Sequence, residues 1–208
     1  MKALVIVDLQ NDFLPGGPMA VPDGVSIIPL LNRLQGQFRL VVATQDWHPP
    51  NHSSFAANHP GRKPGEIARL RRGPVVLRPV HCVQHSPGAE FAPSLNRERV
   101  NRIIRKGTDT NLDSFSGFFD NDHITPTGLG EYLRDKQADD VYVCGLPLET
   151  TVKNTALDAL NLGFRSFLVE DACRAVKPAN AAKAIEEMKT AGVLFTSSGE
   201  ILQWPVRR

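Results

Sequence analysis

The feature that most constrains the fold is an alternation of short apolar runs with longer amphipathic stretches. The apolar runs are residues 3–7, 40–43, 141–144, 167–169 and 193–195. Their continuous Val, Leu and Ile character is typical of strands buried on both faces of a parallel sheet. The amphipathic stretches are residues 25–34, 128–136, 152–162 and 180–190. The alternation predicts an α/β fold: a single-domain, doubly wound, mostly parallel sheet flanked by helices.

Length and composition restrict the class of protein. At 208 residues the chain is long enough for one well-buried domain, which we expect to span residues 1–208. A formal net charge of +2 gives no reason to expect nucleic-acid binding. No run approaches the roughly 20 apolar residues of a membrane span, and the first apolar run ends at Asp8, too soon for a signal peptide. Three widely spaced cysteines do not make a disulfide framework, so we expect a cytoplasmic protein. Whether it forms a homo-oligomer stays open.

A long irregular region follows the second predicted strand. Residues 48–99 are rich in Pro, Gly, His and Asn, and a segment of this kind inside a compact domain is usually functional. We therefore expect a metal-site loop region at about 46–100. In an open parallel sheet, ligands bind beyond the carboxyl ends of the strands. Asp8, Asp46 and Gly145 lie just past such ends, so three distant segments are predicted to converge on one crevice.

Asp46, His48 and His81 are candidate metal ligands. Residues 46 and 48 leave the second predicted strand in extended form, so their side chains point to the same side. His81 is the candidate third ligand. Two imidazoles and one carboxylate, with positions left open, suit a catalytic zinc ion and also iron or manganese. His52 is a candidate for a fourth ligand or for a residue that supports the others.

Asp8 and Lys106 are candidates for acid–base chemistry. Asp8 ends the first, central strand, where partial desolvation raises the pKa of a carboxyl group toward the useful range for a general base. Lys106 follows the apolar pair 103–104, and a lysine at the sheet's edge can stabilise a developing oxyanion. The alternative is a purely structural ion pair. Phe13 is a candidate lid over the site, although a core position is commoner for such a residue.

In chain order, these segments resemble the nicotinamidase/pyrazinamidase family of the isochorismatase-like cysteine hydrolases. The resemblance covers nearly the whole chain and is carried by the motifs DLQNDF at 8–13, QDWHP at 45–49, PVHCVQ at 79–84, KG at 106–107 and VCGL at 143–146. It implies a parallel sheet with flanking helices, metal ligands at Asp46, His48 and His81, and catalytic roles for Asp8 and Lys106.

The resemblance also implies a reaction on a small molecule. In that family a cysteine at the position of Thr151 attacks the carboxamide of nicotinamide, an aspartate takes the thiol proton, and the acyl-enzyme is hydrolysed to nicotinic acid. This reaction belongs to pyridine nucleotide salvage in NAD metabolism. The positions that would contact the substrate are Phe13, Arg78, Leu146, Pro147 and Thr150.

Several of these positions depart from the family pattern. Thr151 replaces the nucleophilic cysteine, and a hydroxyl is a weak nucleophile until a base removes its proton. Pro147 has no backbone N–H for the oxyanion hole, and Leu146-Pro147 is expected to keep the family's cis turn. Arg78 stands where a tryptophan usually flanks the substrate ring, and its cation suits a carboxylate. Thr150 replaces the usual aromatic residue.

These features leave four interpretations. The first is a nicotinamidase-like, metal-dependent amidohydrolase of weak or altered activity, which turns a heteroaromatic amide and water into an acid and ammonia. The second is a catalytically inactive relative that binds a metal and a small ring ligand. The third is an isochorismatase-type hydrolase of an acidic vinyl ether, and the metal triad disfavours it. The fourth, an iron oxygenase, fits the ligand types but fits the predicted fold poorly.

Overall fold

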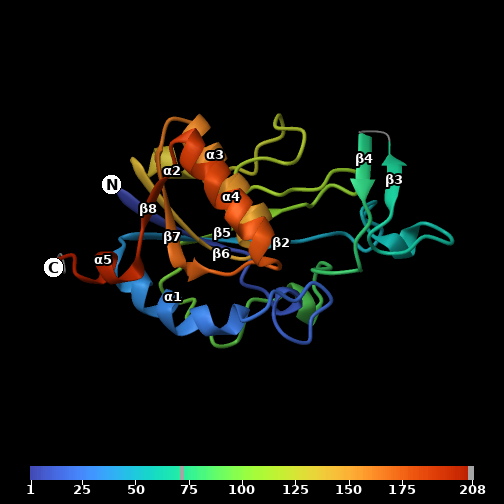
Figure 1. The fold of residues 1–208 in the computed structure, drawn as a ribbon, viewed down its shortest axis with the longest axis horizontal. Helices are drawn as coiled ribbons and strands as arrows, with labels where there is room; N and C mark the ends of the chain where they lie inside the picture. The colour runs from blue at the N-terminus through green and yellow to red at the C-terminus, as the bar shows by residue number, and fades with distance from the viewer. Residues whose placement is uncertain (71–72, 206–208) are drawn as a thin grey trace.

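A six-stranded parallel sheet forms the centre of the computed structural model, which describes residues 1–70 and 73–205 (Figure 1). Its strands are β1 (Lys2–Val7), β2 (Leu40–Asp46), β5 (Arg102–Lys106), β6 (Asp140–Gly145), β7 (Arg165–Cys173) and β8 (Leu194–Thr196). They lie in the order β5-β2-β1-β6-β7-β8, and every pairing is parallel. The predicted doubly wound α/β class is confirmed.

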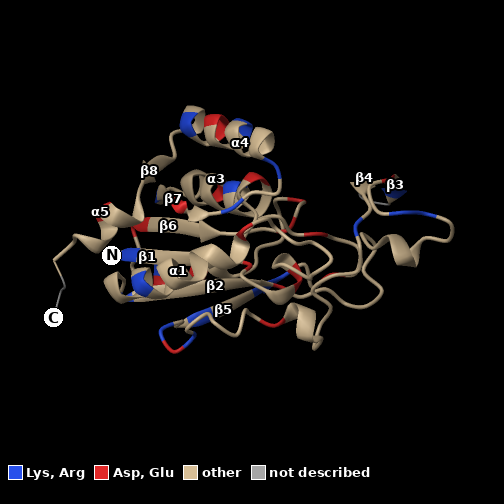
Figure 2. Ribbon diagram, turned by 60° about the horizontal axis from the view of Figure 1, so that its bottom comes forward, with Lys and Arg blue, Asp and Glu red and all other residues tan. Residues whose placement is uncertain are grey.

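Helices cover both faces of the sheet (Figure 1). Figure 1 shows α2 (Leu129–Asp135), α3 (Lys153–Asn161) and α4 (Pro178–Ala191) on one side, with α1 (Ile28–Leu34) and α5 (Ser198–Leu202) on the other. Acidic and basic residues are mixed along α4 (Figure 2), where Lys183 and Glu187 lie 4.0 Å apart on successive turns. Within the described ranges, no helix combines the length and apolarity needed to cross a membrane.

In the central strands, apolar residues do not alternate with polar ones, because both faces of the sheet are covered. Five of the six residues of β1 and all seven of β2 are buried, because helices pack on both faces. Removing such side chains from water stabilises the fold by about 1.5–3 kcal/mol for each large aliphatic residue. The chain runs from β1 through β2 to β5 on one side and from β6 to β8 on the other. The strand order therefore reverses direction between β1 and β6. Open sheets bind ligands at such a point, beyond the carboxyl ends of the strands.

Three elements have no counterpart in the sequence prediction. A hairpin of β3 (Ile67–Leu70) and β4 (Gly73–Val76) extends from the sheet within the region expected to be irregular (Figure 1). Strand β5 was not predicted because it is an edge strand with exposed positions and only a short apolar run. Helix α5 is five residues long, too short for a helical period. Its capping box of Ser197 and Glu200 was the available signal.

Candidate active site

The carboxyl ends of three neighbouring strands bring Asp8, Asp46 and Lys106 together. Asp46 and Lys106 are register partners on β2 and β5, and Asp8 follows β1 directly. The Lys106 Nζ donates a hydrogen bond to Asp46 Oδ1, lies 2.8 Å from Asp8 Oδ2, and donates to the carbonyl of Ser114 at 3.1 Å. All three charged side chains are buried. The structure therefore joins the predicted acid–base pair to the predicted metal group.

Asp8 is held in an uncommon backbone conformation at the end of β1. Its φ angle is 46°, in the left-handed region that few residues other than Gly, Asn and Asp adopt. Thr44, on β2, stabilises this conformation from both sides, since its hydroxyl donates to Asp8 Oδ1 at 2.6 Å and accepts from the Asp8 N–H at 3.2 Å. Asp8 Oδ2 faces the Lys106 ammonium group at 2.8 Å and has no other partner among the described residues.

Burial and neighbouring charges set the protonation of this group. Burial raises the pKa of Asp8 to about 6, although Lys106 opposes the rise. Burial would also raise the pKa of Asp46, but Lys106 and His48 outweigh it and hold that pKa well below its usual range. Burial would lower the pKa of Lys106, but the two carboxylates raise it above its ordinary value. Near neutral pH, Asp46 is thus a carboxylate, Lys106 is a cation, and Asp8 has the pKa of a general base.

Asp46, His48 and His81 present ligand atoms that all lie within 4.8 Å of one another, as predicted for a metal group. His48 donates from Nδ1 to the carbonyl of Gly107 at 2.8 Å, and His81 donates from Nδ1 to the carbonyl of Pro79 at 2.9 Å. These bonds leave each Nε2 with its lone pair free, which is the usual arrangement of metal-binding histidines. His48 Nε2 is buried without a hydrogen-bond partner, 3.7 Å from Asp46 Oδ2. The donor set therefore fits a divalent ion such as zinc.

His52 lies beside this group, but both of its ring nitrogens have protein partners. Nδ1 lies 2.7 Å from the hydroxyl of Ser54 and 3.2 Å from its N–H, while Nε2 lies 3.3 Å from the carbonyl of Leu112. His52 also forms a second group of potential ligands with His48 and Asp113. One oxygen of Asp113 is buried without a hydrogen bond. Asp113 belongs to no motif that could have identified it from the sequence.

Gly145, at the end of β6, brings the next turn against β1. Its φ angle is 118°, and a Cβ there would lie 2.2 Å from the carbonyl oxygen of Val7, so no larger residue fits. The Leu146 N–H donates to that same carbonyl at 3.0 Å. The Leu146 side chain is fully buried and points toward Gly24. The expected cis bond between Leu146 and Pro147 is wrong, because the described residues contain no cis peptide.

Thr151 lies in a π-helical turn, Leu148–Val152, that precedes α3. Its side chain is only 5% exposed, and its carbonyl accepts a hydrogen bond from the Thr155 hydroxyl at 2.7 Å. The Thr151 hydroxyl makes no hydrogen bond to Asp8 within the described part of the chain; Thr44 and Lys106 occupy the surroundings of that carboxylate. Thr150 is half-buried beside it. In this conformation the Thr151 hydroxyl is therefore not activated by the candidate base.

The three cysteines do not offer a replacement nucleophile. Cys82, Cys144 and Cys173 are all buried. Burial raises the pKa of each thiol, and Asp46 reinforces the rise at Cys82. Because the thiolate is the reactive form, these residues stay unreactive thiols.

Aromatic and cationic side chains stand around the metal group. The ring of Phe13 lies edge-on to His81, with 5.9 Å between the ring centroids, and Phe55 contacts His81 at 5.4 Å. Phe13 is buried and makes this contact from the short helix Asn11–Phe13. Arg78 pairs with Phe55 in an isolated parallel bridge and places its guanidinium 5.0 Å from the ring centroid of Phe115.

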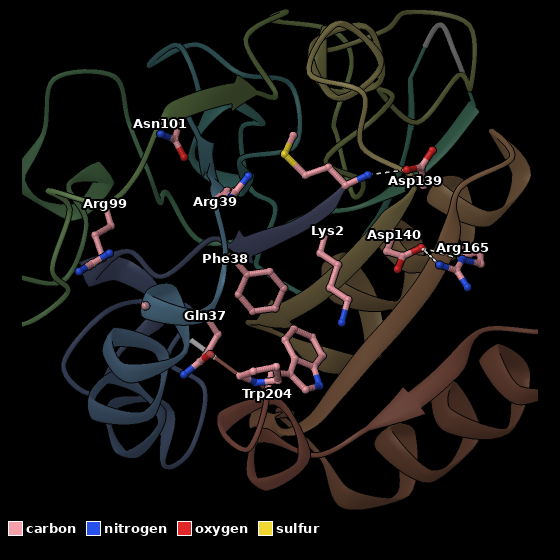
Figure 3. Close-up of a pocket in the computed structure, with 13 residues that line it drawn as sticks. Lys2, Gln37, Phe38, Arg39, Arg99, Asn101, Asp139, Asp140, Arg165 and Trp204 are labelled. Carbon is pink, nitrogen blue, oxygen red and sulfur yellow. Dashed lines mark hydrogen bonds and ion pairs between the residues drawn. The ribbon is translucent and has the colours of Figure 1, made fainter. Parts of the chain in front are cut away.

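A separate cavity lies at the opposite edge of the sheet. Figure 3 shows this cavity of about 800 Å³, with Lys2, Phe38 and Trp204 along its wall. Lys2 begins β1 and Asp140 begins β6, so the cavity lies at the amino ends of the strands, away from Asp8. Lys2 Nζ lies 3.3 Å from the ring centroid of Trp204. This cavity is therefore separate from the buried cluster of Asp8, Asp46 and Lys106.

The parallel sheet, with this polar cluster at its carboxyl edge, has the architecture of the isochorismatase-like hydrolases. The family model described as the isochorismatase domain matches residues 2–200. The chain belongs to the isochorismatase family.

Individual relatives place it more closely within that family. The nicotinamidase of Acinetobacter baylyi is 44% identical over 201 residues, which cover 96% of this chain and 94% of that protein. The solved structure of an Acinetobacter baumanii nicotinamidase pyrazinamidase is 47% identical, with a TM-score of 0.92, and the match covers 96% of this chain and 97% of that one. The Pyrococcus horikoshii pyrazinamidase, solved in complex with zinc, is 40% identical, with a TM-score of 0.78 and coverage of 94% and 98%.

Proposed function

We propose that this chain is an amidohydrolase that converts the carboxamide of nicotinamide, or of a related heteroaromatic amide, and water into the acid and ammonia. The observation that carries the proposal is the position of Lys106 between Asp8 and Asp46, beside the metal-binding group Asp46, His48 and His81. The nicotinamidases and pyrazinamidases among the relatives support the same reaction. Its place would be pyridine nucleotide salvage.

Each side chain has a role that its surroundings support. Asp8 accepts the proton of the nucleophile, because its pKa of about 6 suits a base near neutral pH. Lys106 supplies a fixed positive charge to the oxyanion that develops on the carboxamide. Asp46, His48 and His81 would hold the divalent ion, which when bound contributes positive charge and orients the substrate. Phe13, Arg78, Pro147 and Thr150 are the proposed lining of the substrate site.

The nucleophile differs from the cysteine that the family resemblance leads us to expect. Thr151 occupies the turn from which a nucleophile would attack, but among the described residues its hydroxyl makes no hydrogen bond to Asp8. Asp8 therefore activates either that hydroxyl, after a rotation of the side chain, or a water molecule. Pro147 has no N–H to donate, and loss of one oxyanion donor lowers a rate by about 100- to 1,000-fold. We expect slow turnover.

Ammonia release from nicotinamide by the zinc-loaded protein tests this proposal. Activity should exceed the background and disappear in Asp8→Asn. If Thr151 is the nucleophile, Thr151→Ala abolishes activity and Thr151→Ser retains it; if water attacks, Thr151→Ala stays active. Pro147→Ala combined with Thr151→Cys restores the missing donor and thiol and should raise the rate. No ammonia from any amide, even from that double variant, would overturn the proposal.

A second candidate function is capture of a ring acid or amide without turnover. The observation in its favour is the combination of an unactivated Thr151 hydroxyl with a proline at position 147. Calorimetry with nicotinate and nicotinamide distinguishes the two functions. Tight binding without ammonia release would favour the capture function.

Zinc is our proposed ion, with iron or manganese as alternatives, because the donor set fits it and the related pyrazinamidase was solved with zinc. Metal analysis of the purified protein tests this. We also propose a cytoplasmic location, which cell fractionation tests. A homo-oligomer would appear as a multiple of the 22.9 kDa chain mass in light scattering.

A further inference from the structure

The backbone of Arg78 bonds to the segment of Ser54 and Ala56 and precedes the segment of His81. Its N–H donates to the carbonyl of Ser54 at 2.8 Å, and its own carbonyl accepts from the N–H of Ala56 at 2.9 Å. The next residue, Pro79, accepts the Nδ1 hydrogen bond of His81. The backbone of Arg78 is therefore fixed to both segments that flank the metal group.

The guanidinium group of Arg78 is positioned from the opposite side. It lies 5.0 Å from the ring centroid of Phe115. Phe115 directly follows Ser114, whose carbonyl accepts the hydrogen bond of Lys106. A cation over an aromatic face is held in place without being neutralised. The Arg78 side chain thus extends from the His81 segment to Phe115, whose neighbour Ser114 bonds Lys106.

No described residue neutralises this cation or accepts a hydrogen bond from its Nε. The Nε atom is buried and without a partner. Two other arginines do have carboxylate partners: Arg165 lies 2.6 Å from Asp140 and Arg174 lies 3.0 Å from Asp23. A buried donor without an acceptor is unfavourable, and a guanidinium is suited to bind a carboxylate through two parallel hydrogen bonds. The position therefore has the chemistry of an anion receptor.

The charge of the site favours the same ligand. Asp8, Asp46 and Asp113 carry three negative charges when ionised, and Lys106 together with a divalent ion carries three positive charges. Arg78 adds a further positive charge that the catalytic reaction on a neutral amide does not need. A substrate with its own negative charge would balance this excess.

We propose that the preferred substrates are aromatic carboxamides that carry a second, anionic ring substituent, and that Arg78 pairs with that substituent. This inference rests on the proposed amide hydrolysis. The carboxamide C–N bond breaks, water supplies the new C–O bond, and the products are ammonia and a ring with two carboxylates. Arg78 is then a specificity-determining residue of the site.

The test compares nicotinamides that carry a ring carboxylate with the methyl esters of the same compounds. These pairs share the ring and the amide and differ in charge, and the set includes all ring positions open to the carboxylate. The wild-type protein should favour the carboxylates by about 10- to 100-fold in kcat/KM, mainly through KM. Arg78→Met should remove this preference, Arg78→Lys should keep part of it, and Arg78→Trp should favour the neutral esters and nicotinamide.

Arg105→Met is the matched control variant. Arg105 also places its guanidinium over an aromatic ring, 4.0 Å from the centroid of Trp47, and directly precedes Lys106. Its removal should leave the carboxylate preference unchanged. Thermal unfolding and zinc content show whether each variant is folded and loaded. Equal losses for carboxylate and ester in Arg78→Met, or a wild-type preference for the neutral amides, would overturn the inference while leaving amide hydrolysis intact.

If the protein hydrolyses no amide, binding affinities measured by calorimetry still test the role of Arg78. Pyridine dicarboxylates should then bind the wild-type protein at least about 10-fold more tightly than nicotinate, and Arg78→Met should remove that difference. Such a result would keep the role of Arg78 although the proposed function fails. Identical affinities for nicotinate and the dicarboxylates would overturn the role of Arg78 in either case.

Discussion

Lys106 lies between two buried carboxylates: it forms a hydrogen-bonded ion pair with Asp46, and its Nζ lies 2.8 Å from Asp8 Oδ2. One cation thus couples the candidate metal group to the candidate base. The arrangement follows from the strand order, because β5, β2 and β1 are neighbours and Asp46 and Lys106 share a register position. Removing either partner leaves a charge buried without compensation.

Replacing Lys106 by methionine is expected to lower the free energy of unfolding of the metal-free protein by about 3–5 kcal/mol, because two buried carboxylates lose their cation. Urea unfolding measures this change. As a control, Arg62→Met removes one partner of the exposed pair with Glu66 and should change stability by less than about 1 kcal/mol. Equal effects of the two substitutions would show that Lys106 does not compensate the carboxylates.

Zinc binding should depend on His81 far more than on His52. His81→Ala removes a proposed ligand and should abolish stoichiometric binding in calorimetry. His52→Ala removes only a neighbouring ring, and losing such a supporting residue typically weakens metal affinity by about 10- to 100-fold. His123→Ala serves as the control, since that side chain is 69% exposed and outside the group. If His52→Ala abolishes binding as His81→Ala does, His52 is a ligand.

Gly107→Ala should weaken zinc binding, because a Cβ at this position would lie 2.4 Å from a ring atom of His48. The φ angle of Gly107 is 63°, so the substitution also carries a backbone strain of about 1–2 kcal/mol. Gly128→Ala separates these two effects, because its φ angle is 92° and no atom lies within 4 Å of its Cβ. That variant should lose stability and keep its zinc affinity. Equal zinc affinities for the two variants would contradict the proposed restraint on His48.

Amide hydrolysis should fall as the pH is lowered through the pKa of Asp8. The base must be ionised to accept a proton, and burial raises its pKa to about 6. Activity is therefore expected to be full above this value and to decline below it. A bound divalent ion nearby favours the carboxylate, so the inflection of the kcat/KM profile should lie at or below pH 6. An inflection well above pH 7 would assign the titration to another group.

Most of the sheet could be predicted, because the signal for a buried strand is local. The apolar runs at 3–7, 40–43, 141–144, 167–169 and 193–195 all correspond to strands. Strand β5 and the hairpin β3–β4 could not be predicted in this way. Their residues are partly exposed, so no buried apolar run marks them. Strand β5 is a strand because it pairs with β2, which is distant in the sequence, and β3 and β4 are strands because they pair with each other.

Some residues of the candidate site could be predicted from the sequence, and others could not. The ligand types and their place after strand ends pointed to Asp8, Asp46, His48, His81 and Lys106, and the structure brings them together. Thr44 and Asp113, which contact or adjoin this group, carried no motif. The environment of Thr151 could not be predicted from the sequence either. The partners of its hydroxyl depend on how its own segment packs against those of Asp8, Thr44 and Lys106.

The sequence by itself determined the fold class and the kinds of chemical groups at the carboxyl edge of the sheet, because periodicity and the order of residues after each strand are properties of short segments. Tertiary structure decided which of those groups meet. It put Lys106 between two carboxylates and gave both nitrogens of His52 protein partners. Among the described residues, it left Arg78 Nε without an acceptor and made no hydrogen bond between the Thr151 hydroxyl and Asp8. Lys106 lies about a hundred positions from Asp8 and sixty from Asp46, so strand order and side-chain packing set these distances.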